Sequence, residues 1–272
     1  MKHHIHVKTC KKPEILREFL TSFEKFGYAE SENILTVGDD NPGECLEIFK
    51  QFPWIDAYLT GNTNAIWANN NRGIKYFLEH TDADALMLLD HDVELLKTAL
   101  FVEIERAHIY EKQHHITGFA KGLDGIDGLQ VVFPCVAESQ FLRWHPGCHG
   151  VMLWQTRALI EQVGYQLSFD YFYGAEHAEY SHRCLVAQGQ SMKLYPVLKR
   201  SDHFFQLNPN DFSAYPVDFE RVTETNQQKM LDRDADTIRG RNLRQREHNL
   251  DKEIIVKSRD RQTAESIKNS LL

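Results

Sequence analysis

The stretch Ala85-Leu86-Met87-Leu88-Leu89-Asp90-His91-Asp92 decides the fold of this chain. Its first five residues form a continuous apolar run, which is typical of a strand that is buried on both faces of a parallel sheet. Two acidic residues, Asp90 and Asp92, follow directly. Because ligands of open parallel sheets bind beyond the carboxyl ends of the strands, this stretch predicts a central strand that ends in a polar site.

Upstream of this stretch, further short strands alternate with helical patterns. We expect strands at Ile5–Thr9, Asn33–Val37 and Ala57–Leu59. Apolar residues recur at helical spacing from Pro13 to Gly27 and from Ile66 to Leu78, which predicts a helix in each segment. A strand–helix rhythm of this kind predicts an α/β fold with a largely parallel sheet and right-handed crossovers.

The second half of the chain predicts mixed elements, followed by a change in composition. Strands are expected at Gln130–Cys135 and Gly150–Trp154, and helices at Thr156–Val163 and Glu176–Gln188. The last 55 residues contain 12 basic and 11 acidic residues and almost no aromatic ones. We therefore expect one domain over residues 1–217 and a charged helical extension over residues 218–272.

The composition excludes several classes of protein. The chain has 272 residues, of which 42% are apolar, enough for a sizeable core. The net charge of -8 argues against a general nucleic-acid binder, and no apolar run approaches the roughly 20 residues that span a bilayer. Five cysteines without a C-x-x-C pair argue against a disulfide framework or a cysteine zinc site. We expect a cytoplasmic protein without a transmembrane segment, with peripheral attachment to a membrane as the alternative.

Polar residues end three of the expected strands and could face one crevice. They are Thr9, the pair Asp39-Asp40, and Asp90-His91-Asp92. Aspartate also favours turns after strands, which is the simpler explanation for Asp39-Asp40 alone. Carboxylates are good ligands for Mg²⁺ or Mn²⁺, which proteins often hold with one or two acids and the phosphates of a substrate. The three strand ends together favour a site for a metal ion and a diphosphate.

Further motifs extend this pattern along the chain. They are Val7–Leu16, Val37–Asn41, Asn70–Ile74, Asp90–Asp92, Gly150–Trp154, Tyr173–Arg183 and Arg200–Phe205. In this order they resemble the motifs of nucleotide-sugar-dependent glycosyltransferases of the GT-A fold. The segment Tyr173–Arg183 is similar to one in bacterial chondroitin-type polymerases and polypeptide N-acetylgalactosaminyltransferases. The resemblance runs from about Val7 to Gln206 and implies a GT-A, Rossmann-like fold, with a mixed, mostly parallel sheet flanked by helices.

The resemblance also implies roles for individual residues. Contacts to the nucleotide sugar are expected from Thr9, Asp39, Asp40, Asn71 and Asp90. A Mn²⁺ or Mg²⁺ ion is expected on Asp90, Asp92 and His203, with His203 completing the metal shell. Asn70 stands where the family has an arginine, so a direct charge contact to phosphate from that position is lost. Trp144 and Glu179 are expected near the sugar or the acceptor, and a loop anchored by a buried Trp144 is the alternative.

The pair Glu176-His177 is the expected catalytic centre. Inverting relatives place an aspartate after the glutamate, and this chain has His177 there. Histidine can act as a base near neutral pH, so Glu176, His177 or Glu179 could take the proton of the acceptor hydroxyl. At a helix start, exposed amide groups favour a carboxylate such as Glu176.

The resemblance implies a metal-dependent glycosyltransferase of hexosyl or N-acetylhexosaminyl type. Inversion is expected, and retention, which needs no base at the position of His177, is the alternative. The donor is expected to be a UDP-sugar, and the acceptor a hydroxyl group of a glycan or a protein; the acidic net charge disfavours a DNA acceptor without removing it. One alternative is a nucleotide-sugar-binding protein without turnover, which His177 favours. Another is a Mg²⁺-dependent nucleotidyltransferase, although its additional acidic ligands and basic triphosphate loop are not found. The C-terminal extension could mediate homo-oligomerisation.

Overall fold

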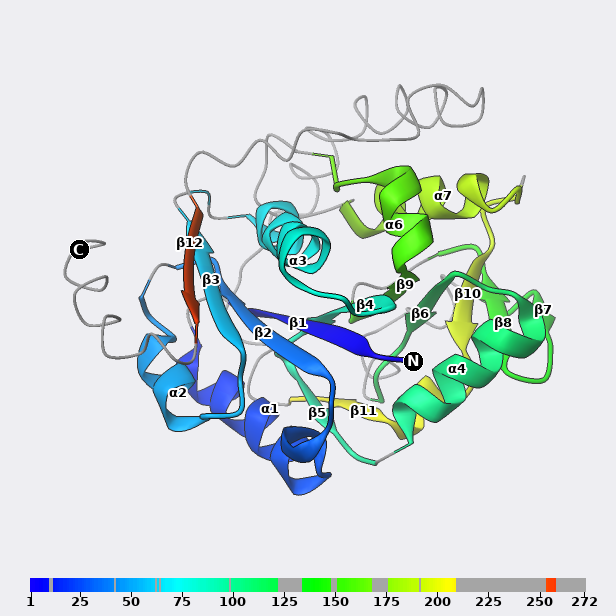
Figure 1. Ribbon diagram of the computed structural model, residues 1–272. Helices are drawn as coiled ribbons and strands as arrows, with labels where there is room; N and C mark the ends of the chain where they lie inside the picture. Colours follow the sequence, from blue (N-terminus) through cyan, green and yellow to red (C-terminus); the bar gives the residue numbers. More distant parts are fainter. Residues whose placement is uncertain are drawn as a thin grey trace, which may run out of the picture.

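A ten-stranded sheet with helices on both faces forms the centre of the molecule (Figure 1). The computed structural model describes residues 1–9, 12–41, 43–61, 63, 65–97, 99–121, 134–147, 151–167, 176–190, 192–208 and 253–257. The strand order is β12-β3-β2-β1-β4-β9-β6-β10-β8-β7. These strands are β1 (His3–Thr9), β2 (Ile34–Asp39), β3 (Ala57–Gly61), β4 (Ala85–Asp90), β6 (His115–Gly118), β7 (Ala137–Glu138), β8 (Leu142–His145), β9 (Met152–Thr156), β10 (Tyr195–Leu198) and β12 (Glu253–Lys257).

Most strands of this sheet run in one direction. The strands β3, β2, β1 and β4 pair in parallel, and so do β6 and β10. Strand β9 is antiparallel to both β4 and β6, so these two strands point the same way. Only β12, β9 and β8 among the described strands run against the others. The expected α/β class with a mixed, mostly parallel sheet is confirmed.

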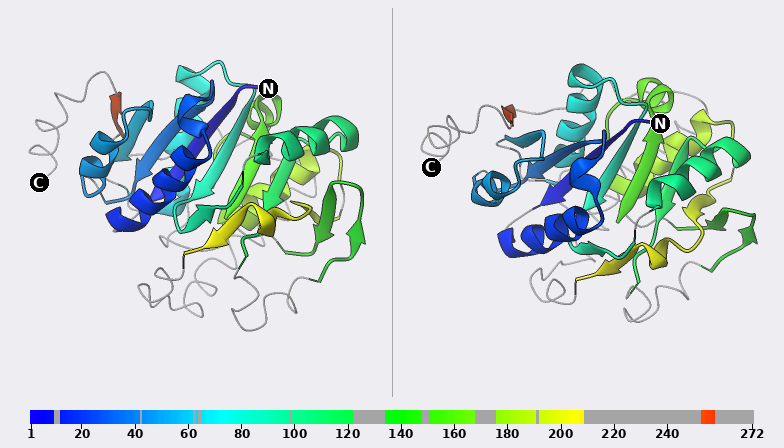
Figure 2. Two further views of the ribbon diagram at one scale, coloured as in Figure 1. Left: turned by 90° about the horizontal axis from the view of Figure 1, so that it is seen from below. Right: turned by 60° about the horizontal axis from the view of Figure 1, so that its bottom comes forward.

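The helices form a layer on each face of the sheet (Figures 1 and 2). One layer contains α1 (Pro13–Lys25), α2 (Leu46–Gln51) and α4 (Leu100–Glu111), and the other contains α3 (Ile66–His80), α6 (Arg157–Val163) and α7 (Glu176–Ala187). Successive side chains of a strand point to opposite faces. In β4, Met87 and Leu89 join the core under α1, whereas Leu86 and Leu88 join the core under α3, α6 and α7. The apolar run Ala85–Leu89 is therefore buried on both faces, as predicted.

The two long N-terminal helices follow from their sequences. Pro13 occupies the first turn of α1, where its missing N–H costs nothing. Leu16, Phe19 and Phe23 line the buried side of that helix. The chain leaves α1 through Gly27, whose φ of +77° is a left-handed conformation that glycine adopts without strain.

Helix α3 packs against β1 and β2 at two glycines, Gly38 and Gly73, which both lie against the His6 ring. A Cβ added at Gly73 would lie 2.4 Å from ring atoms of His6, and one at Gly38 would lie 1.9 Å from Asn69 Oδ1. These distances are shorter than any real carbon contact. Only glycine therefore lets α3 approach the sheet so closely at these two positions.

A small second sheet brings the segment after β10 beside the residues that follow the Asp90-His91-Asp92 motif. It pairs β5 (Val93–Leu95) antiparallel with β11 (Phe205–Leu207). The pairing continues one step further, since Asn208 N donates to Asp92 O at 2.7 Å. Residue Lys121 extends this arrangement by bonding to both Phe205 and Leu207 of β11.

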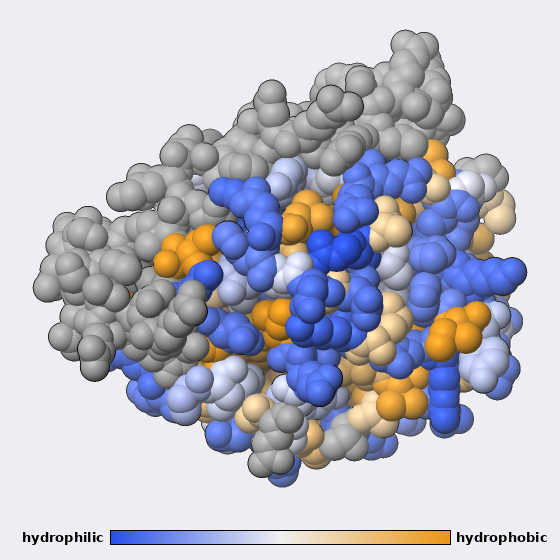
Figure 3. Space-filling model, viewed as in Figure 1, coloured by the Kyte–Doolittle hydropathy of each residue, from blue (hydrophilic) through white to orange (hydrophobic). Residues whose placement is uncertain are grey.

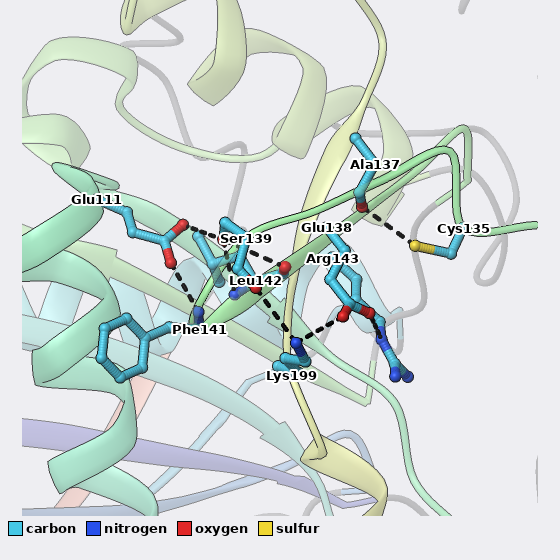
Figure 4. A network of polar contacts seen from close by, with 9 residues as sticks. All are labelled: Glu111, Cys135, Ala137, Glu138, Ser139, Phe141, Leu142, Arg143 and Lys199. Carbon is cyan, nitrogen blue, oxygen red and sulfur yellow. Dashed lines mark hydrogen bonds and ion pairs between the residues drawn. The ribbon is translucent and has the colours of Figure 1, made fainter.

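The β7–β8 hairpin at the far edge of the sheet is fastened by acidic side chains (Figure 4). Glu111, at the end of α4, accepts hydrogen bonds from Ser139 Oγ at 2.5 Å and from Phe141 N at 2.7 Å. Glu138 pairs with Lys199 Nζ at 2.6 Å and with Arg143 Nε at 2.8 Å. These contacts tie the hairpin to α4 and to the residue that follows β10.

The expected strands of the first half, the helices at α1, α3, α6 and α7, and strand β9 are confirmed within a few residues at each end. The strand expected at Gln130–Cys135 is not seen where it can be checked, because Pro134 and Cys135 lie outside any strand and residues 130–133 are outside the described residues. Sequence patterns also missed α2, α4, β6, β8 and β10. The strands β6, β8 and β10 have four residues each, and the partners of β6 and β10 lie far away in the sequence.

The C-terminal segment contains a strand where a helix was expected. Residues Glu253–Lys257 form β12, which pairs antiparallel with β3 and closes one edge of the large sheet. The expectation of a helical extension is wrong for these five residues. Ile254, Ile255 and Val256 are β-branched, which favours a strand over a helix. The remainder of 218–272 and the expected boundary at 217 lie outside the described residues.

The visible surface in Figure 3 is mostly hydrophilic, with small separate apolar spots. Exposed large apolar residues in the described part of the chain include Val102, Ile109, Tyr110, Val136 and Met192. Single exposed apolar residues are ordinary on protein surfaces. Among the described residues, no helix is both long enough and apolar enough to cross a bilayer.

Candidate active site

The carboxyl end of β1 is the centre of the candidate site. Asp40 N donates to Thr9 O at 3.0 Å, and His91 N donates to Lys8 O at 3.2 Å. Strand β1 has β2 on one side and β4 on the other. The structure therefore brings Thr9, Asp39-Asp40 and Asp90–Asp92 to one edge of the sheet, at the position where parallel sheets bind ligands.

Asp39 anchors the loop that follows β2. Its Oδ2 accepts hydrogen bonds from Tyr58 Oη at 2.6 Å and from Cys45 N at 2.9 Å, and its Oδ1 accepts one from Asn41 N at 2.9 Å. Burial raises the pKa of Asp39 to about 6, although these hydrogen bonds act in the opposite direction. Both carboxylate oxygens are engaged within the protein, so Asp39 shapes the border of the site.

Asp40 points to the other face of β2, where α3 supplies two partners. Arg72 Nη1 lies 3.2 Å from Asp40 Oδ1, and the Asn69 side chain also hydrogen-bonds to the carboxylate. Burial raises the pKa of Asp40 to about 7, while Arg72 and Asn69 lower it. Arg72 has no role among those that the sequence motifs imply. The available signal was its place two residues after Asn70, the position compared with the family's arginine.

Asn71 and Asn70 hold the segment that follows α6. Asn71 Nδ2 donates to Gln166 O at 3.0 Å, and Gln166 N donates to Asn71 Oδ1 at 2.7 Å. Asn70 Nδ2 donates to Gln166 Oε1 at 2.9 Å. All three residues are fully buried. The structure therefore uses Asn71 to fasten two segments together and does not present its amide to the site as expected.

A chain of buried hydrogen bonds leads from the sheet interior to Asp40. His6 Nε2 lies 3.0 Å from Asn69 O and 2.9 Å from Asn69 Oδ1, which are both acceptors, so Nε2 carries the proton. Thr36 Oγ1 then donates to His6 Nδ1 at 2.9 Å and accepts from His4 Nε2 at 2.8 Å. Burial lowers the pKa of His6 to about 4, consistent with a neutral ring. Asn69 is thus oriented on both sides, because its Nδ2 donates to Gly38 O at 2.9 Å.

The two acids of the Asp90-His91-Asp92 motif have different surroundings. Asp90 Oδ1 lies 2.6 Å from Lys8 Nζ, in an ion pair that is largely shielded from solvent. Asp92 Oδ1 is buried and has no hydrogen-bond partner. Burial raises the pKa of Asp92, and the charge of Asp90 adds to this rise. His91 lies between them, and burial lowers its pKa to about 4.

His203 lies apart from this motif. It belongs to a 3₁₀ turn (Ser201–His203) and is exposed. Two residues later, Phe205 pairs with Leu95, which is three residues, or about 10 Å, along the strand from Asp92. The β5–β11 register therefore separates His203 from the acids it was expected to join, and Asn208 stands beside Asp92 instead. Within the described ranges, no three His, Cys, Asp or Glu side chains converge as a metal site.

Glu176 and His177 form a pair at the first turn of α7. His177 Nε2 lies 3.1 Å from Glu176 Oε1. The carboxylate is almost fully buried, and the imidazole is partly accessible. In this arrangement the imidazole Nε2–H donates to the carboxylate, which leaves Nδ1 as the basic nitrogen of a neutral ring. The preceding Gly174-Ala175 lies outside the described residues.

Glu179 serves the fold. Arg183 Nε and Nη2 lie 2.5 Å and 3.0 Å from its two carboxylate oxygens, and both side chains are buried. Arg183 also donates to Val163 O and to Tyr165 O, each at 2.7 Å, which caps the end of α6. With both oxygens bound to one arginine, Glu179 does not reach toward a sugar or an acceptor as expected. A bidentate pair with arginine fixes the orientation of the carboxylate and occupies both of its oxygens.

Trp144 and Thr9 have packing roles that the structure shows directly. Trp144 lies in β8, opposite Pro196 of β10, and packs half-buried against the main core. Trp144 therefore belongs to a strand and is not the buried anchor of a loop, and its contact with the sugar or the acceptor stays a prediction. Thr9 Oγ1 lies 3.5 Å from Cys45 Sγ, beside the loop that Asp39 anchors.

Comparisons with known proteins identify solved structures that share this fold. No family model and no curated protein sequence matches the chain. The solved structure of the mannosyltransferase PcManGT from Pyrobaculum calidifontis, in complex with GDP-Man and Mn²⁺, is similar with a TM-score of 0.57 and 12% identity over 88% of this chain. This chain spans 64% of the length of that mannosyltransferase.

Two structures of residues 1–349 of S. aureus TarS are also similar. The complex with UDP-GlcNAc has a TM-score of 0.60 and 15% identity, and the match covers 100% of this chain and 72% of the other. The complex with UDP has a TM-score of 0.54 and 14% identity, covering 97% and 69%. The chain therefore shares its fold with a mannosyltransferase and with TarS, whose solved structures hold a nucleotide or a nucleotide sugar.

Proposed function

We propose that this protein is a glycosyltransferase that moves a sugar from a nucleotide-sugar donor, a UDP-sugar, to a hydroxyl group of a glycan or a protein, with inversion. The observation that carries the proposal is the meeting of Thr9, Asp39-Asp40 and Asp90–Asp92 around the end of β1. The similar structures support it, because they share the fold and were solved with UDP, UDP-GlcNAc or GDP-Man.

The donor would lie across the carboxyl edge of β2, β1 and β4. Asp40 is held in place from two sides by Arg72 and Asn69, so it is a preorganised acceptor for nucleoside hydroxyl or N–H groups. Asp90 is held by Lys8 in the same way. Fixed carboxylates lose little conformational entropy when a ligand binds, which favours recognition of one nucleoside orientation.

A divalent cation fits the environment of Asp92. A buried carboxylate oxygen without a partner is costly unless a cation or water meets it, and Asp92 Oδ1 is such an atom. We propose that Asp92 would hold Mn²⁺ or Mg²⁺ together with phosphate oxygens of the donor, the ligand set that Mg²⁺ commonly has in proteins. The ion would offset the charge that develops on the leaving diphosphate.

The acceptor proton would be taken by the Glu176–His177 pair. With Nε2–H directed to the Glu176 carboxylate, His177 Nδ1 can accept the proton while the carboxylate stabilises the resulting imidazolium. Helix α7 packs with α3 and α6 on the face of the sheet that also carries Lys8 and Asp40. This shared face supports the assignment of the pair to the same reaction.

Ligand-induced stabilisation tests the donor assignment. We expect a UDP-sugar at 100 times its Kd, with Mn²⁺ present, to stabilise the fold by about 2.7 kcal/mol. For a domain of this size that corresponds to a rise in Tm of roughly 5 to 10 °C. Absence of any shift across UDP-, GDP- and CMP-sugars would contradict the proposal.

Nucleotide release tests turnover. A transferase releases UDP faster when an acceptor hydroxyl is supplied, whereas a binding protein shows the thermal shift without any release. The second outcome would favour the alternative in which His177, in place of the family's aspartate, marks a protein that binds the donor without turnover.

A further inference from the structure

We infer that Lys8 is a built-in counter-ion of the Asp90-His91-Asp92 motif. Lys8 prevents Asp90 from coordinating a divalent cation, and cation binding therefore depends on the nucleotide diphosphate. The inference rests on the proposed function and deepens it. It concerns the order in which the cation and the nucleotide bind, and it names Lys8 as the positioning residue responsible.

The pair Lys8–Asp90 is built into the register of the sheet. Lys8 in β1 stands directly opposite Asp90 in β4, and Nζ lies 2.6 Å from Oδ1. The lysine side chain is only 5% exposed, so its ammonium group is committed to partners inside the protein. The pair holds its geometry, because separating the two charges would leave the buried Lys8 ammonium group uncompensated in a poorly solvated place, while Asp90 is partly exposed.

The side chains of this pair lie on a crowded face. His6, two residues before Lys8, faces Asn69 and Gly73 of α3, and Leu88, two residues before Asp90, belongs to the core under α3. Because side chains alternate along strands, Lys8 and Asp90 share that face. Neither side chain can turn to the opposite face without breaking the strand pairing.

The other acid of the motif, Asp92, differs from Asp90 in the partners of its carboxylate. Its Oδ1 has no hydrogen-bond partner, whereas Asp90 Oδ1 has the Lys8 ammonium group. Lys8 and Lys12 both interact electrostatically with Asp92 in the direction that favours its charged form. The same two positive charges would repel a divalent cation that approached the motif without a nucleotide.

The diphosphate of the donor supplies what the motif lacks. Its negative charge would balance Lys8 and Lys12, and its oxygens would add ligands beside Asp92 Oδ1. Cation and nucleotide binding should therefore be strongly coupled. Thermodynamic linkage makes this coupling reciprocal, so Mn²⁺ tightens UDP by the same factor by which UDP tightens Mn²⁺.

Binding of Mn²⁺ to the full chain tests the inference, with free Mn²⁺ measured by electron paramagnetic resonance. Wild type should bind Mn²⁺ at least tenfold more tightly with UDP than without it. Lys8→Met frees Asp90 and removes one positive charge, so it should bind Mn²⁺ without UDP at least tenfold more tightly than wild type. Lys8→Met/Asp90→Asn should lose that gain. Lys25→Met, an exposed lysine on α1, is the matched control and should behave as wild type.

The outcomes of this experiment separate the inference on Lys8 from the proposed function. If wild type binds Mn²⁺ only with UDP but Lys8→Met gains nothing without UDP, the inference is overturned and the proposed function stands. Tight Mn²⁺ binding to wild type without UDP also overturns the inference. If wild type binds no Mn²⁺ even with UDP, the proposed cation site at Asp92 fails and takes the inference with it, while the thermal shift with nucleotide sugars still decides the proposed function. Should Lys8→Met not fold, Lys8→Gln removes the same charge while retaining a hydrogen-bond donor to Asp90, and a gain of at least threefold is then expected.

Discussion

Replacing Glu179 by glutamine separates a structural glutamate from a catalytic one on the same helix. Glu179 is 1% exposed and binds the fully buried Arg183 through both carboxylate oxygens. Breaking a buried pair by neutralising one partner costs about 3 to 5 kcal/mol, because the other charge stays buried without its counter-ion. Two backbone carbonyls, Val163 O and Tyr165 O, still accept from Arg183, so we expect the lower end, about 3 kcal/mol.

Thermal unfolding and UDP release measure the two consequences of Glu179→Gln. A loss of about 3 kcal/mol corresponds to a fall in Tm of roughly 6 to 12 °C for a domain of this size. At a temperature where the variant is folded, turnover should stay within threefold of wild type. Glu176→Gln is the matched control: its Tm should change by less than about 3 °C, while turnover falls at least 100-fold, the usual range for loss of acid–base catalysis. Unchanged Tm together with lost turnover in Glu179→Gln would refute the structural role.

Three further predictions concern the scaffold around the site. Gly73→Ala should destabilise the fold by about 2 kcal/mol although alanine favours helices by about 1 kcal/mol, because the new Cβ would lie 2.4 Å from the hydrogen-bonded His6 ring; a raised Tm would contradict this. His115 is buried with its pKa lowered to about 3, so its neutral form adds stability above pH 6.5 that is lost as the pH falls below that value, about 2 kcal/mol by pH 5. Denaturant titrations at several pH values should show that the free energy of unfolding falls less steeply below pH 6.5 in His115→Gln than in wild type. An equal decrease in both proteins would count against this role of His115. A chain ending at residue 252 lacks β12 and exposes the edge of β3, so light scattering should detect more self-association than in the full chain, and none would argue that β12 is dispensable.

The sequence predicted the central elements because their patterns are local. The apolar run Ala85–Leu89, the helical spacing after Pro13 and the acids at strand ends are all visible within a few residues. Strand β12 was missed because a strand of five residues inside a charged segment is defined by its pairing with β3, nearly 200 residues earlier. Short strands such as β10 depend in the same way on distant partners.

The candidate site was predicted only in part, because the partners of its residues are also defined by contacts between distant segments. Residue type and motif placed Asp40, Asp90 and Asp92 correctly at one edge of the sheet, but they do not show which acids already have partners. Arg72 and Lys8 became visible only when α3 and the β1–β4 register were known. His203 was misplaced because the register of β11 against β5 brings Asn208, five residues later, to Asp92. Motif spacing carries no information on such a register.

Affinity for UDP with and without Mn²⁺, measured by calorimetry on wild type and Asp92→Asn, tests the central claim most directly. We predict that Mn²⁺ tightens UDP binding by wild type at least tenfold and that Asp92→Asn abolishes this gain, because the variant loses the carboxylate whose Oδ1 lacks a partner in the protein. Glu94→Gln, at an exposed acid two residues away, is the control and should retain the gain. Retention of the full Mn²⁺-dependent gain by Asp92→Asn, with its Tm equal to that of wild type, would contradict the assignment of this edge of the sheet as a metal-assisted nucleotide-sugar site.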